Sequence, residues 1–145
     1  MAATVREWLQ ALKELEQFDF DDFFKKERLE KQKLLWKEGD PAQDLIFLLS
    51  GAIRLSRESE FKGREIVTGI VTAGNLLGSA NILDGAPQTV SAIALEESTF
   101  LRLDREHFAR LLRDHPQAGM ELLTLLVRAV SAQCDQIVAR LASIF

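Results

Sequence analysis

The N-terminal stretch repeats apolar residues with a helical period. The residues that share this period are Trp8, Leu9, Leu12, Leu15 and Phe18. Such spacing places apolar side chains on one face of an α-helix. Phe20, Phe23 and Phe24 add further apolar side chains just beyond them. We therefore predict a helix over residues 5–28, within an N-terminal helical region of residues 1–32.

From about residue 33 the pattern changes to short runs of apolar and β-branched residues. Runs of this composition are typical of β-strands. We predict strands over residues 34–36, 44–49, 52–56, 65–71, 89–94 and 99–103.

Five glycines separate these runs at a nearly constant spacing. They stand at positions 39, 51, 63, 74 and 85, so the intervals are 12, 12, 11 and 11 residues. Turn residues at this spacing are typical of an all-β barrel or sandwich. We predict a compact β-roll of short strands over residues 33–103. The alternative is that the glycines are spaced by chance.

Two helices are predicted after the strands, over residues 104–145. Asp104 suits the N-cap of the first, because its carboxylate can accept hydrogen bonds from free N–H groups of the first turn. This helix should end before Pro116, since the residue before a proline disfavours the helical conformation. Pro116 in turn suits the first turn of the last helix, which we predict to run to about Ile144.

The last helix carries two apolar stripes. The first has the spacing 4, 3, 4, 3, 4, 3 and comprises Leu123, Val127, Val130, Cys134, Ile137, Leu141 and Ile144. This spacing is that of the contact seam between two helices, so we predict a homodimer through it, with Cys134 acting as a small apolar residue. The second stripe, Leu122, Leu126 and Ala129, can then pack on the β-roll. The alternative is one wide apolar face buried within the same domain.

Composition and charge narrow the function classes. The 145 residues fit one domain, residues 1–145, and 47% apolar with 28% charged residues is typical of a globular protein. The net charge of −4 and the lack of a basic stripe disfavour direct binding to nucleic acid or to an anionic membrane. No apolar run approaches the length of a membrane span, and the N-terminus has no apolar signal-peptide core. We expect a cytoplasmic protein.

No residue pattern indicates catalysis, a metal ion or a cofactor. His107 and His115 are eight positions apart and do not share a helical face as i, i+4 ligands would. The predicted β-roll contains neither His nor Cys that could ligate haem. Arg54, Arg57 and Arg64 are interpreted as solvated residues at strand ends rather than a phosphate clamp. We expect no enzyme and no cofactor, with a small-molecule effector of unknown identity left open.

Three motifs follow one another along the predicted β-roll. Residues 36–42, WKEGDPA, open the roll, residues 45–54, LIFLLSGAIR, form its next strand pair, and residues 74–94 read GNLLGSANILDGAPQTVSAIA. In this order they resemble the F-x-E-G-D-P-A entry, the strand pair and the phosphate-binding cassette of the cyclic nucleotide-binding domain. The form they resemble is that of bacterial transcription regulators in the cAMP receptor protein and fumarate-nitrate regulator (CRP/FNR) family. The resemblance implies a mainly β fold with flanking helices: a double-stranded β-helix (β-roll, jelly roll) followed by a long C-terminal dimerisation helix.

The family cassette reads roughly G-E-(aliphatic)-(small)-(aliphatic)-(aliphatic)-x-x-x-P-R-(S/T/A). Aligned without a gap, the matching positions are Gly78, Ile82, Leu83, Pro87 and Thr89. Ser79 stands where the family has the Glu that binds the ribose 2′-hydroxyl, and Gln88 where it has the Arg that pairs with the cyclic phosphate. Because both charged side chains are replaced by neutral ones, affinity for cAMP and cGMP is expected to fall by at least about two decades.

The candidate ligand contacts in the cassette are Gly78, Ser79, Ala80, Asn81, Gln88 and Thr89. Their polar members have two interpretations. They form a pocket for a less charged ligand, or they satisfy the backbone of their own turn. The resemblance also implies a pocket beneath the last helix, which makes Gln133, Gln136 and Ile137 candidates for its lid.

Three hypotheses for function follow: a sensor of a non-standard effector, a ligand-free dimerisation or adaptor module, and a cyclic-nucleotide sensor with substituted contacts. In the family, pocket occupancy is coupled to the geometry of the dimer helix, which requires a ligand that distinguishes two states. Relatives continue from this helix into a helix-turn-helix domain. We expect either the regulatory part of a transcription regulator, with a DNA-binding domain beyond residue 145, or a free-standing module that acts through a protein partner.

Overall fold

The computed structural model describes residues 4–61 and 63–144. Its strands are β1 (Lys25–Leu29), β2 (Leu34–Trp36), β3 (Asp44–Ser50), β4 (Ala52–Glu58), β5 (Glu65–Thr72), β6 (Leu76–Leu77), β7 (Ser91–Ala94) and β8 (Ser98–Asp104). Its helices are α1 (Val5–Glu14), α2 (Phe20–Phe23), the 3-10 helix η1 (Ala80–Leu83), α3 (Arg105–Asp114) and α4 (Pro116–Ile144). Residues 1–3, 62 and 145 of the predicted 1–145 domain lie outside the described residues.

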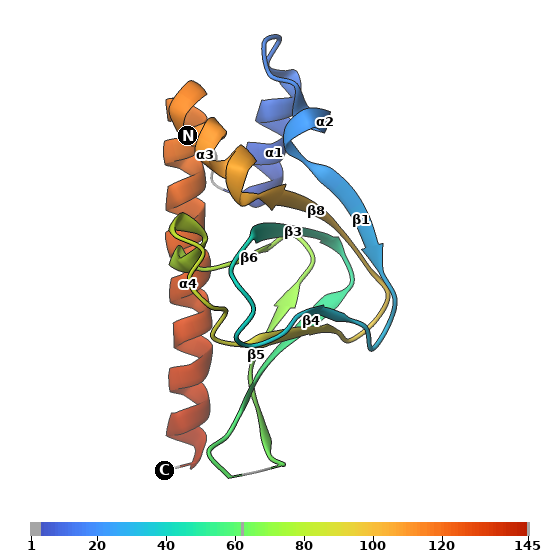
Figure 1. Ribbon diagram of the computed structural model, residues 1–145, viewed down its shortest axis with the longest axis vertical. Helices are drawn as coiled ribbons and strands as arrows, with labels where there is room; N and C mark the ends of the chain where they lie inside the picture. The colour runs from blue at the N-terminus through green and yellow to red at the C-terminus, as the bar shows by residue number, and fades with distance from the viewer. Residues whose placement is uncertain (1–3, 62, 145) are drawn as a thin grey trace.

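The strands form two four-stranded antiparallel sheets that face each other as a β-roll. One sheet has the order β1-β8-β3-β6 and the other β2-β7-β4-β5. Helix α4 runs along one side of this roll, and α1 to α3 gather at one end of it (Figure 1). The predicted β-roll with a long C-terminal helix is therefore confirmed.

Strand β3 is buried on both faces and separates the two halves of the core. Ile46 and Leu48 pack against the opposite sheet, whereas Leu45 and Phe47 pack against the helices. This division follows from the alternation of side chains along a strand. A run of apolar residues such as LIFLL is therefore what a strand covered on both faces requires.

Trp8 joins the N-terminal helix to the roll. Its ring stacks on Phe47 of β3 with 5.6 Å between ring centroids, and its indole N–H donates to the carbonyl oxygen of Ala118 in α4 at 3.2 Å. A buried Trp keeps its N–H satisfied in this way. The first turn of α4 is thus fixed to both α1 and β3.

The predicted continuous helix over residues 5–28 is wrong, because the range holds two separate helices, α1 and the short α2, and the start of a strand. Helix α1 ends at Glu14, and Lys25–Leu29 forms β1, which pairs with β8 at the edge of its sheet. The sequence KKERL has no β-branched residue and favours a helix in isolation. Pairing with β8 overrides that preference, and Arg102 of β8 donates to the carboxylate of Glu27 across the pair.

The turn glycines and the C-terminal helices agree with the predictions. All five glycines of the regular series have a positive φ, between +73° and +94°, a conformation that glycine adopts without strain. Their spacing therefore reflects turns rather than chance. Asp104 caps α3 by accepting from the backbone N–H of His107 at 2.8 Å, α3 ends at Asp114, and α4 spans Pro116–Ile144.

Helix α4 differs from one sequence expectation. By length and composition alone it is apolar enough to cross a membrane. This is weak evidence for a span, because Leu122, Leu125 and Leu126 of the same helix are buried in the core of the domain.

Candidate functional site

The cassette lies directly under α4. Gly78 is buried, and a Cβ atom at this position would stand 2.3 Å from Cδ2 of Leu45 in β3 and 3.8 Å from Cδ1 of Leu126 in α4. Gly78 does not have a positive φ, so its backbone conformation does not call for glycine. Glycine is needed here because the backbone lies close to two core side chains. The cassette therefore touches both the roll and the long helix at its first motif position.

Ser79 and Asn81 hydrogen-bond within their own loop. The hydroxyl oxygen of Ser79 accepts from the backbone N–H of Asn81 at 3.2 Å and caps η1. The side-chain amide of Asn81 donates to the carbonyl oxygen of Pro87 at 2.8 Å. For these two residues the geometry favours the interpretation that polar side chains satisfy the turn. Ala80 and Thr89 are exposed.

Gln88 differs from the other polar residues of the cassette. It is only 7% exposed, and in the described part of the chain its side-chain amide has no hydrogen-bond partner. Its backbone is held on both sides: its N–H donates to Asp40 at 2.7 Å, and its carbonyl oxygen accepts from Gly39 at 2.8 Å. The position that carries an Arg in the family pattern is therefore a neutral side chain that is largely buried, while its amide atoms are not among the fully buried atoms without a partner in the described residues.

Of the three arginines of the predicted roll, Arg57 contacts the cassette, where its guanidinium donates to the carbonyl oxygen of Thr89 at 3.5 Å. Arg57 pairs with Glu38 at 3.5 Å, and Arg64 is exposed. The interpretation of Arg54 as a solvated strand end is wrong, because it lies inside β4 and its Nε is buried without a hydrogen-bond partner among residues 4–61 and 63–144. Its neighbours Ile53 and Leu55 face the core, so strand alternation directs Arg54 to the outer face of the sheet.

A further arginine lies against the cassette at Gly85. A Cβ atom on Gly85 would stand 2.8 Å from Nη1 of Arg105, the first residue of α3. Arg105 lines a groove of about 400 Å³ between the cassette and α3, together with Gln43, Ile82, Leu83, Glu106, Phe108, Ala109 and Leu112. Neither Ser79 nor Gln88 lines this groove.

Two of the three predicted lid residues lie over the roll. Gln133 and Gln136 line a cavity of about 120 Å³ between α4, β5 and β6, together with Ile70, Val71, Thr72, Asn75, Leu76, Ala129 and Ala132. Ile137, the third, is 41% exposed and does not line it. The cassette residues Ser79 and Gln88 do not line this cavity either.

Gln136 and Arg140 bond α4 to the backbone of β5. The side-chain oxygen of Gln136 accepts from the N–H of Ile70 at 3.2 Å. One turn later, the guanidinium of Arg140 donates to the carbonyl oxygen of Val67 at 2.9 Å. Sequence reasoning missed Arg140 and also Gly69, which lies between these two contacts. The glycine inside a strand was the available signal.

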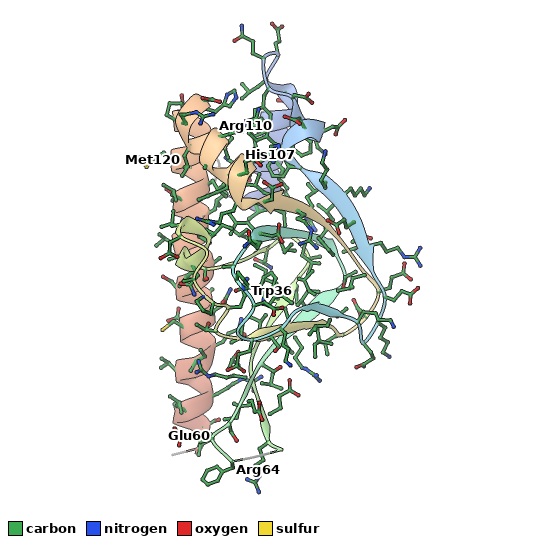
Figure 2. The ribbon with its side chains drawn as sticks, in the orientation of Figure 1. Trp36, Glu60, Arg64, His107, Arg110 and Met120 are labelled. Atoms are coloured by element: carbon green, nitrogen blue, oxygen red, sulfur yellow. The ribbon has the colours of Figure 1, made fainter. Side chains whose placement is uncertain are left out.

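The two stripes of α4 separate as the pattern suggested. Leu122 and Leu126 of the second stripe are buried in the core. The first stripe is exposed for most of its length, with exposed fractions from 38% at Val130 to 72% at Ile144; Cys134 is exposed too, and Leu123 packs partly against the core. A single buried apolar face is therefore excluded. Met120 also points away from the domain (Figure 2).

Known proteins resemble this chain in sequence over the roll and the cassette. The cyclic nucleotide-binding domain family matches residues 26–115. The cyclic AMP receptor protein of Thermus thermophilus is 31% identical over 106 residues, 73% of this chain and 49% of that protein. The global nitrogen regulator of Nostoc sp. is 30% identical over 112 residues, 76% of this chain and 48% of that protein.

A solved structure shows the same fold over nearly the whole chain. The cyclic nucleotide-binding domain from Methylobacillus flagellatus superposes with a TM-score of 0.78 at 23% identity, covering 96% of this chain and 81% of that one. The chain spans about half the length of the curated relatives it matches. Because the family matches more than half of its residues, the chain belongs to the cyclic nucleotide-binding domain family.

Proposed function

We propose that this chain is the effector-sensing domain of a CRP/FNR-like transcription regulator whose cassette binds cAMP and cGMP weakly or not at all. The observation that carries the proposal is Gln88, a neutral and largely buried side chain where the family pattern has an Arg. A cyclic phosphate placed against Gln88 would lose its water without gaining a charged partner. Burying an anion in that way is costly.

Ser79 removes a second contact of the family pattern. Its hydroxyl is shorter than a glutamate side chain and already accepts the N–H of Asn81. The free N–H groups at the start of η1 remain as donors, but η1 has four residues and contributes too small a dipole to replace a cation. Both recognition positions therefore favour a less charged effector over a cyclic nucleotide.

The exposed stripe of α4 supports a homodimer as the form that acts. Val127, Val130, Ile137, Leu141 and Ile144 expose apolar side chains along one line of the helix, and a second copy can cover them in coiled-coil fashion. In this proposal the effector acts by changing how α4 meets its partner. Direct contact with DNA belongs to another domain or to a protein partner, the location is cytoplasmic, and the chain has no catalytic role.

A ligand-free dimerisation or adaptor module is the second candidate. Ser79 and Asn81 satisfy their own loop, and this favours a cassette kept as structure rather than as a binding site. Thermal unfolding of the purified chain with cAMP, cGMP and uncharged metabolites separates the candidates. Stabilisation by an uncharged metabolite supports the proposal, no stabilisation by any compound supports the adaptor, and stabilisation of several degrees by micromolar cAMP contradicts both.

A further inference from the structure

Strand β5 is the edge of its sheet, and α4 covers that edge with polar side chains. An edge strand leaves one row of backbone N–H and C=O groups without a strand partner. On β5 the N–H of Ile70 and the C=O of Val67 are bonded by Gln136 and Arg140, respectively. These two α4 residues are four apart and share one face of the helix. Side chains of α4 thus bond two backbone groups of β5 that a further strand would otherwise pair with.

Gly69 makes room for one of these contacts. A Cβ atom at this position would stand 2.7 Å from the side-chain oxygen of Gln136 and 4.0 Å from Cδ1 of Leu55, a core residue of the roll. Gly69 lies inside β5 and does not have a positive φ, so its conformation does not call for glycine. The carboxamide of Gln136 therefore occupies the space that a side chain of residue 69 would fill, next to the interior of the roll.

The two halves of α4 are held to the domain by different forces. The first half buries Leu122, Leu125 and Leu126. After Ala129, no described residue of α4 is buried. This half meets the roll through Ala132 and Gln133, which line the small cavity, and through the hydrogen bonds of Gln136 and Arg140. Solvent-accessible hydrogen bonds exchange with water at little net cost. The second half can therefore separate from β5 while the first half stays packed.

We propose that Gln136 is a positioning residue that couples the space above Gly69 to the second half of α4. While its carboxamide occupies this space, Gln136 holds α4 on the edge of β5. A group that fills the space displaces the carboxamide and releases the helix from Ile70 and Val67. The hydrogen bond between Gln136 and Ile70, here termed the latch, is a property of the chain alone. Its use by an effector rests on the proposed function.

The exchange rate of the Ile70 amide proton, measured by NMR on the whole chain, tests the latch. Gln136→Leu keeps the size of the side chain but removes the acceptor, and Gly69→Ala places a methyl group in the space that the carboxamide uses. Each change is expected to speed Ile70 exchange by roughly three- to tenfold, the range that one accessible hydrogen bond supports. Gln136→Glu retains an acceptor oxygen and should keep the slow exchange.

Two comparisons make the test specific. Because both changes break the same contact, Gly69→Ala combined with Gln136→Leu should exchange no faster than Gln136→Leu alone. Gln133→Leu, which changes a neighbouring glutamine that does not bond Ile70, should leave the rate unchanged. Core amides of β3 report global unfolding and should not change in any surface variant.

Unchanged Ile70 exchange in Gln136→Leu overturns the latch, and so does a rate that rises further, multiplicatively, in the double variant. Gln136→Leu lies on the surface and does not depend on whether Gly69→Ala folds. If the exchange rates behave as expected but the chain binds no effector, the role of Gln136 is supported and only the proposed function is wrong.

Discussion

The backbone N–H of Gln88 donates to the carbonyl oxygen of Asp40 at 2.7 Å. This bond ties the cassette to the turn that opens the β-roll, and the return bond from Gly39 to the carbonyl oxygen of Gln88 completes the pair. The backbone of residue 88 is therefore fixed by groups that do not depend on its side chain. A change of this side chain can alter the chemistry of the site while the frame stays in place.

Gln88→Arg should destabilise the ligand-free chain. A guanidinium at a position that is 7% exposed would be buried without a partner, which costs about 1–3 kcal/mol or more. Added cAMP should restore part of this stability, because the phosphate supplies the missing charge. Thermal unfolding with and without cAMP measures both effects. Gln88→Glu is the matched control, which should be destabilised without any rescue by cAMP.

Val130→Glu should convert the proposed homodimer into monomers. The substitution places a charge in the middle of the exposed stripe, where two copies would bring like charges together in an apolar contact. Sedimentation velocity measures the mass directly. Ala139→Glu lies on the exposed opposite side of α4 and should leave the dimer intact. An unchanged mass for Val130→Glu would rule out the stripe as the contact.

Gly78→Ala should lower stability by roughly 1–3 kcal/mol, the usual cost of inserting an extra carbon into a packed core. The added Cβ atom would stand 2.3 Å from Leu45, so β3 or the cassette must shift. Urea unfolding measures the change in the free energy of unfolding. Ala80→Ser, at an exposed neighbouring position, is the control. A stability equal to that of the unchanged chain would argue against close packing under α4.

Asp104→Ala should cost about 1 kcal/mol at pH 7 through loss of the α3 N-cap. Partial burial acts to raise the pKa of Asp104, but hydrogen bonds from the backbone and imidazole of His107 outweigh it, and the pKa lies below its ordinary value. A lowered pKa stabilises the fold above the unfolded-state value, near 3.9, and this stabilisation is lost as the pH falls through the folded-state pKa.

The free energies of unfolding of Asp104→Ala and of the unchanged chain should therefore differ less at pH 3 than at pH 7. Urea unfolding at the two pH values measures this difference. A gap that stays constant or widens in acid would show that the carboxylate charge of Asp104 does not contribute to the cap.

The sequence predicted the parts of the fold that local pattern determines. The alternating runs, the turn glycines and the Asp104 and Pro116 signals depend on neighbouring residues, and the structure agrees with all of them. Strand β1 was missed because KKERL becomes a strand only through pairing with β8, about 70 residues later.

At the candidate site, the motif located the cassette but not the partners of its side chains. The hydrogen bonds of Ser79 and Asn81, and the absence of one for Gln88 among the described residues, depend on three-dimensional contacts. The same is true of Gln136 and Ile70, which are 66 positions apart. Gly69, a glycine inside a strand, indicated that another group lies close to the backbone there, but the sequence did not identify this group as Gln136.

Calorimetric titration of the unchanged chain with cAMP is the decisive measurement for the cassette, with Ser79→Glu/Gln88→Arg measured beside it. Because Ser79 and Gln88 supply no charge, the unchanged chain should give no saturable heat up to about 1 mM cAMP, a binding free energy weaker than about −4 kcal/mol. The double variant should bind measurably. Micromolar binding of cAMP by the unchanged chain would show that the cassette recognises a cyclic nucleotide without either charged side chain, and the proposed weak binding would be wrong.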